Sequence, residues 1–123
     1  MTTAGYALGR AGEKTAARYL KSRGYTLVKQ NYKHKTFEID IIAKDKDVLC
    51  FVEVKTRSNI RKALPREAVS RAKQKKMILG ATTYLKEKKL VNQRARFDVV
   101  EVVYSNGSNP PDITHIQNAF SGV

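Results

Sequence analysis

Two apolar segments separated by a short charged stretch constrain the fold of this chain more than any other feature. Phe37–Ala43 and Val48–Lys55 are rich in β-branched and aromatic residues, and residues 44–47 (Lys-Asp-Lys-Asp) have the polar composition of a turn. The pattern predicts a β-hairpin whose two strands supply much of the core.

Ionisable side chains interrupt this otherwise apolar hairpin. Because side chains alternate between the faces of a strand, Glu38 and Asp40 share one face, as do Glu53 and Lys55. Charged groups at such positions are costly unless they are paired or bind a metal. The residues expected to line the opposite, buried face are Val48, Cys50, Val52 and Val54.

Asp40 followed by Glu53-Val54-Lys55 has the spacing of the PD-(D/E)XK nuclease active site. Two carboxylates can hold Mg²⁺, which bridges a scissile phosphate and lowers the pKa of a bound water. An adjacent ammonium can orient that water and offset charge that develops on the phosphate. For the bare motif, a cross-strand salt bridge from Lys55 to Asp40 or Glu38 is the simpler interpretation.

The composition indicates one domain spanning residues 1–123, with residues 1–8 and 105–112 expected to be flexible. No segment reaches the length of a membrane span, and no signal peptide is visible. The single cysteine, Cys50, lies in an apolar strand pattern and is interpreted as a buried structural thiol. Cytoplasm is the expected location, and no membrane partner is expected.

A large positive charge indicates a polyanionic partner. The net charge is +13, and residues 61–96 carry 12 basic and 2 acidic groups, whereas residues 97–123 carry 3 acidic and no basic groups. Such a charge imbalance favours nucleic acid as the binding partner. Arg57, Arg61 and Lys62 follow the Glu-Val-Lys segment and are candidates to contact the phosphate backbone of a bound nucleic acid.

Two helices are predicted, at Leu8–Arg23 and from Pro65 to Lys88. Glu13 lies within the apolar sector of the first helix and is a candidate to face the same site as Asp40, although a glutamate early in a helix also complements the helix dipole. Gly12 would let that helix approach a sheet closely. Lys73 and Gln74 begin the apolar stripes of the second helix and are candidate phosphate contacts, with an exposed lysine as the alternative.

Further strands are predicted at Tyr25–Tyr32 and Arg94–Val103, and residues 113–120 are expected to be strand-like at most. Asp98, in the second of these strands, is interpreted as structural. The predicted order is helix, three strands, helix and strand around a mixed central sheet, which is an α/β fold.

The chain resembles the YraN-type family of small bacterial proteins, predicted endonucleases related to archaeal Holliday junction resolvases. The resemblance rests on Gly9–Glu13, Glu38–Ala43, Phe51–Arg57, Phe97–Val100 and Asn118–Phe120, and covers nearly the whole chain. One departure is Phe37, where the family usually has glycine, so that its side chain would crowd an approaching DNA backbone.

The resemblance implies a restriction-endonuclease-like core that acts on DNA. Asp40 and Glu53 correspond to the metal ligands, Lys55 to the catalytic lysine, and Glu13 to a glutamate that supplements the metal site. We expect the backbone carbonyl of Val54 to complete the binding of Mg²⁺ or Mn²⁺. Because junction-resolving relatives act as dimers, the resemblance also implies a homodimer.

Two functions from different classes fit these residues. The first is a metal-dependent DNA endonuclease, with a preference for branched or junction DNA. The second is a nucleic-acid-binding module on the same fold that no longer cuts. The intact set of Asp40, Glu53 and Lys55 favours the enzyme, because binding alone requires none of them.

Overall fold

The computed structural model describes residues 3–58, 69–104 and 110–122. These residues form an α/β fold with one five-stranded sheet, in the chain order α1 (Thr3–Ser22), β1 (Thr26–Lys33), β2 (Glu38–Asp45), β3 (Val48–Arg57), α2 (Arg71–Glu87), β4 (Ala95–Val103) and β5 (Asp112–Phe120). The predicted α/β class with a mixed sheet is therefore confirmed.

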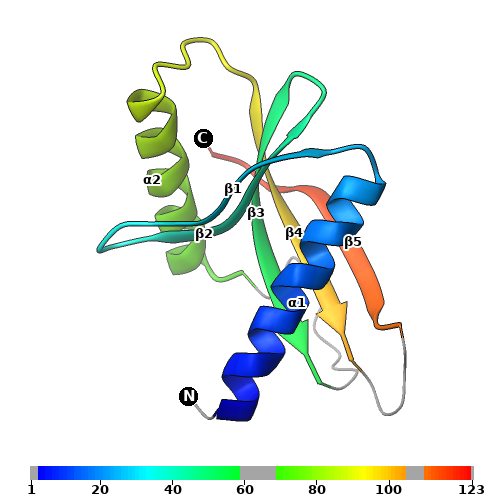
Figure 1. Cartoon of the computed structure of the whole chain (residues 1–123). Helices are drawn as coiled ribbons and strands as arrows, with labels where there is room; N and C mark the ends of the chain where they lie inside the picture. Colours follow the sequence, from blue (N-terminus) through cyan, green and yellow to red (C-terminus); the bar gives the residue numbers. More distant parts are fainter. Residues whose placement is uncertain (1–2, 59–68, 105–109, 123) are drawn as a thin grey trace.

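The sheet has the strand order β1-β2-β3-β4-β5, and β3 lies at its centre (Figure 1). β3 and β4 are parallel and are connected through α2, whereas the other neighbouring strands are antiparallel. The predicted hairpin is present as β2 and β3, with Ile42 paired to Phe51 and a turn at residues 46–47.

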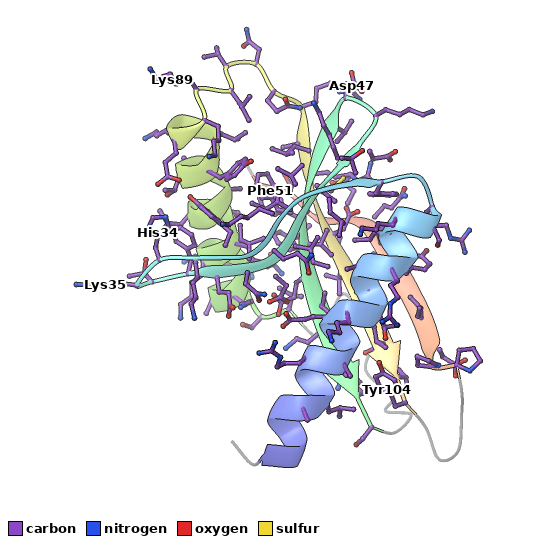
Figure 2. The ribbon with its side chains drawn as sticks, viewed as in Figure 1. His34, Lys35, Asp47, Phe51, Lys89 and Tyr104 are labelled. Atoms are coloured by element: carbon purple, nitrogen blue, oxygen red, sulfur yellow. The ribbon has the colours of Figure 1, made fainter. Side chains whose placement is uncertain are left out.

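A helix covers each face of the sheet. On one face Ala16 and Leu20 of α1 join a cluster with Cys50 and Val52. On the other, side chains of α2 pack over Phe51, which lies between this helix and the sheet in Figure 2. Only one face of residues 48–55 was expected to be buried, and this expectation is wrong. β3 is central and covered on both sides, so Leu49, Phe51 and Glu53 are buried as well.

Two glycines bring the helices close to the sheet. A Cβ atom added to Gly12 would lie 1.9 Å from Thr56 Oγ1, so the predicted close approach of α1 is confirmed. A Cβ added to Gly80 of α2 would lie 2.8 Å from side-chain atoms of both Ile39 and Phe37. Phe37 is buried beneath α2, so its side chain is directed into the core.

Several element boundaries differ from prediction. α1 begins at Thr3, not at Leu8, so residues 3–8, which were expected to be flexible, are part of this helix. α2 begins at Arg71, not at Pro65, because Ser70 has an extended conformation and its side chain accepts a hydrogen bond from Lys73 N–H, which caps the helix. Residues 112–120 form the complete edge strand β5, paired to β4 from Val103–Asp112 to Phe97–Phe120. An edge strand that is partly exposed on both faces shows little apolar alternation, and this obscured it in the sequence.

Cys50 is fully buried in the centre of the sheet, as predicted. Burial raises the pKa of its thiol to about 12, so the thiolate is negligible at neutral pH. The side chain therefore contributes packing in the α1 face of the core.

Candidate active site

Asp40 and Glu53 lie on adjacent strands at the centre of the sheet. The antiparallel register pairs Ile41 with Val52, and Asp40 and Glu53 directly adjoin this last pair of the hairpin. Both residues are buried, with 8% and 5% of their surface exposed. Asp40 Oδ2 accepts a hydrogen bond of 2.8 Å from Val54 N–H, which fixes the carboxylate beside the Glu-Val-Lys segment.

Two lysines face the buried carboxylate of Glu53 without hydrogen-bonding to it. Lys73 Nζ lies 3.6 Å from Oε1, and Lys55 Nζ lies 4.0 Å from Oε2. Glu53 Oε1 has no hydrogen-bond partner among the residues that the structure describes. An unpaired buried oxygen costs stability, and such exceptions in a well-formed core need a physical explanation. Lys55 thus pairs with Glu53, not with Asp40 or Glu38 as in the cross-strand alternative.

Asp40 destabilises the ionised form of Glu53, whereas a hydrogen bond from the Glu53 carboxyl group favours the ionised form of Asp40. Burial, together with the charge of Asp40, raises the pKa of Glu53 to about 7, although Lys73 and Lys55 act in the opposite direction. Burial also raises the pKa of Asp40, against the hydrogen bond from Val54 and the charge of Lys73. Bringing two carboxylates together in a desolvated place is unfavourable for a folded chain alone, whereas a divalent cation would stabilise both.

Glu13 of α1 lies close enough to Asp40 for the Asp40 charge to act on it. It is half-buried, and burial followed by the charges of Asp40 and Glu38 raises its pKa. Within residues 3–58, 69–104 and 110–122, no three His, Cys, Asp or Glu side chains are grouped closely enough to hold a metal by themselves. Oxygen donors such as the carboxylates of Asp40 and Glu53 suit Mg²⁺ or Mn²⁺.

The candidate nucleic-acid contacts differ in their surroundings. Arg57 Nε donates to Glu101 Oε2 of β4, and the Gln74 amide donates to the Val69 carbonyl at 3.1 Å, so each makes a contact within the fold. Lys73 faces Glu53, as described above. Arg61 and Lys62 lie outside the described residues.

Comparison with known proteins agrees with the resemblance seen in the sequence. The chain matches the profile described as "Uncharacterised protein family UPF0102" over residues 12–102. It belongs to the UPF0102 family. It is 50% identical over 113 residues to a UPF0102 protein of Desulforapulum autotrophicum, covering 92% of each chain. It is 47% identical over 112 residues to one of Clostridioides difficile (91% of this chain, 95% of the relative) and 44% identical over 112 residues to one of Clostridium acetobutylicum (91% and 92%).

Basic side chains cover the outward surfaces of both helices of this UPF0102 chain. These basic side chains point away from the apolar helix faces that contact the sheet, so they do not disturb the packing of the core. Neither helix of the described residues is long and apolar enough to cross a membrane. The exposed basic residues on the two helices are Arg10, Lys14, Arg18, Lys21, Arg71, Lys75, Lys76 and Lys86.

A second group of polar residues is buried away from Asp40 and Glu53. Asp98 is fully buried in β4, and its carboxylate accepts hydrogen bonds from Arg96 Nε at 3.0 Å, from His115 Nε2 at 2.9 Å and from Asn118 N–H at 3.0 Å. These contacts join β4 to β5, which confirms a structural interpretation of Asp98. His115 has no recognisable signal in the sequence, because it lies in the weakly patterned edge strand β5.

Proposed function

We propose that this UPF0102 protein is a metal-dependent endonuclease that hydrolyses phosphodiester bonds of DNA, with a preference for branched or junction substrates, on a restriction-endonuclease-like core. Asp40, Glu53 and the backbone carbonyl of Val54 would hold Mg²⁺ or Mn²⁺. The charge of Asp40 raises the pKa of Glu13, and Glu13 would act on the metal directly or through water.

One observation carries the proposal: a pair of buried carboxylates whose ionised forms repel each other, with one oxygen lacking a hydrogen bond among the described residues. Elsewhere in the same fold, buried carboxylates are satisfied by direct hydrogen bonds, as Asp98 is by Arg96. Two neighbouring buried carboxylates destabilise the folded chain unless a cation is bound. This favours a metal-binding role for Asp40 and Glu53 over a structural one.

The chain's own groups have separate tasks in this proposal. A bound divalent ion supplies charge stabilisation at the phosphate and a water of lowered pKa. Asp40 and Glu53 hold the cation, and Asp40 is itself oriented by Val54 N–H. Lys55 lies on the same strand face as Glu53, with 38% of its side chain exposed, so its ammonium can reach both the carboxylate and a phosphate oxygen. It would orient the attacking water and offset charge on the phosphate.

The proposed partner follows from charge. The net charge of +13 is concentrated in residues 61–96, and the lysines and arginines of α2 in this segment are mostly exposed. Contacts between such side chains and phosphates release counterions, so affinity would fall steeply as salt rises. They would position the DNA backbone and would not read the sequence of bases.

The test is incubation of the purified protein with linear duplex, single-stranded, flap and four-way DNA, with Mg²⁺, with Mn²⁺ and with a chelator. Cleavage that requires the metal and is fastest on branched substrates is expected. Salt-dependent binding without cleavage under every condition would overturn the enzyme and leave the binding module. Sedimentation of the same sample would test the expected homodimer.

Replacing Lys55 with alanine is expected to lower single-turnover cleavage by about 10²-fold or more, as for other positioned acid–base groups. The melting temperature should change little, because the ammonium lies 4.0 Å from Glu53, is partly exposed, and leaves Lys73 in place. DNA affinity should fall by no more than one phosphate contact allows. A less stable but fully active variant would contradict the role of Lys55 in chemistry.

A further inference from the structure

Lys73 is held in position by the start of α2. Its backbone N–H donates to the Ser70 side chain at 3.1 Å, and Gln74 N–H donates to the Ser70 carbonyl at 2.8 Å. The Gln74 amide also donates to the Val69 carbonyl. These bonds fix the first turn of the helix, so the origin of the Lys73 side chain is well defined although the side chain itself is long and flexible.

The Lys73 ammonium compensates the charge of Glu53 but does not satisfy its oxygen. Nζ lies 3.6 Å from Oε1, beyond hydrogen-bond length, and Oε1 has no other partner among the described residues. Glu53 is almost completely buried, whereas 32% of the Lys73 side chain is exposed. The positive end of this pair can therefore move into solvent, and the negative end cannot.

Other buried carboxylates of the fold are paired in a different way. Asp98 accepts a hydrogen bond of 3.0 Å from Arg96, and Glu101 accepts one from Arg57. Arginine makes rigid, directed bonds to a carboxylate, whereas lysine is a compact point charge on a flexible stem. Lys73 and Lys55 pair with Glu53 through charge alone, so either cation can leave without breaking a hydrogen bond.

We propose that Lys73 is an internal counter-ion that occupies the charge position of a divalent cation and withdraws from Glu53 when the cation binds. This inference rests on the metal site of the proposed function. After withdrawal, the Lys73 ammonium lies at the solvent-exposed side of the site, where it can pair with a phosphate group. In the absence of nucleic acid, the free-energy cost of separating Lys73 from Glu53 weakens metal binding. A nucleic-acid phosphate that pairs with the released ammonium offsets this cost. Metal and nucleic acid would thus strengthen each other's binding.

The test is calorimetric titration of Mn²⁺ into the protein without nucleic acid, for the wild type, Lys73→Gln, Lys76→Gln and Asp40→Asn. Lys76 is an exposed lysine of the same helix, so its substitution makes the same change in net charge away from Glu53. Lys73→Gln is expected to bind Mn²⁺ about fivefold more tightly than the wild type. Lys76→Gln should match the wild type, and Asp40→Asn should lose binding.

Lys73→Arg provides a second variant that keeps the charge and does not depend on the folding of Lys73→Gln. Because a guanidinium can hydrogen-bond to the Glu53 oxygen that Lys73 leaves unpaired, Lys73→Arg should bind Mn²⁺ more weakly than the wild type. Affinities of both Lys73 variants equal to that of the wild type would overturn the counter-ion role and leave the metal site intact. A wild type that binds no Mn²⁺ would overturn the site and the counter-ion role together.

Discussion

Replacing Asp40 with asparagine is expected to lower metal-dependent DNA cleavage by about 10³-fold or more, because a bound metal contributes several kcal/mol of transition-state stabilisation. The variant should remain folded. The asparagine oxygen can still accept the hydrogen bond from Val54 N–H, and the repulsion between residue 40 and Glu53 disappears. DNA binding should be unchanged or stronger, since one anion is removed from the site.

The matched control is Asp47→Asn, which removes the same charge from the exposed turn between β2 and β3 (Figure 2). This variant should cleave at the wild-type rate. Single-turnover cleavage, melting temperature and DNA affinity measured on the same preparations distinguish a lost metal ligand from a damaged fold. An Asp40→Asn protein that cleaves as fast as Asp47→Asn would exclude Asp40 from the site.

Local patterns predicted the elements that carry strong periodicity. The β2–β3 hairpin, α1 and β4 were identified because their apolar residues recur with the spacing of a strand or a helix and are bounded by glycine or charged turns. Gly12 is a clear case: its place on the apolar side of α1 predicted a close helix–sheet contact, and Thr56 supplies that contact. The α/β class followed from the order of these elements.

Features that depend on tertiary neighbours could not be predicted in this way. The burial of both faces of β3 requires knowing that α1 and α2 lie on opposite sides of the sheet, which no single segment encodes. β5 was underestimated because an edge strand bonds to one neighbour only, and its pattern is accordingly weak. The start of α2 is set by the N-cap Ser70, which the sequence prediction missed because Pro65 suits the first turn of a helix.

The candidate site shows the same division. Motif spacing identified Asp40 and Glu53, and the register of the hairpin brings them together. The approach of Lys73 to Glu53 depends on how α2 crosses the sheet, so the sequence suggested only a phosphate contact. Helical periodicity predicted an inward direction for Glu13, and in the structure this residue is half-buried and within reach of the charge of Asp40.

Replacing Asp98 with alanine is expected to lower the free energy of unfolding by about 3–5 kcal/mol, the range for removing one partner of a buried ion pair. The carboxylate is fully buried and accepts hydrogen bonds from Arg96, His115 and Asn118 N–H. Without it, donors from β4 and β5 lose their common acceptor in a place that water does not reach. Urea unfolding at neutral pH measures the loss, and Asp47→Ala is the control. Because the Asp47–Arg94 pair is exposed at both ends, its loss should cost less than about 1 kcal/mol.

The cost of losing Asp98 should depend on pH. Burial alone would raise the pKa of Asp98, but the hydrogen bonds from His115, Arg96 and Asn118 outweigh it and lower the pKa below its ordinary value of 3.8. A carboxyl group with a lowered pKa in the folded state contributes stability above its unfolded pKa and loses it as the pH falls through the folded value. The difference in unfolding free energy between wild type and Asp98→Ala should thus be largest at neutral pH and shrink below pH 3.8. If the difference in unfolding free energy is the same at neutral pH and below pH 3.8, packing around residue 98, and not its charge, joins β4 to β5.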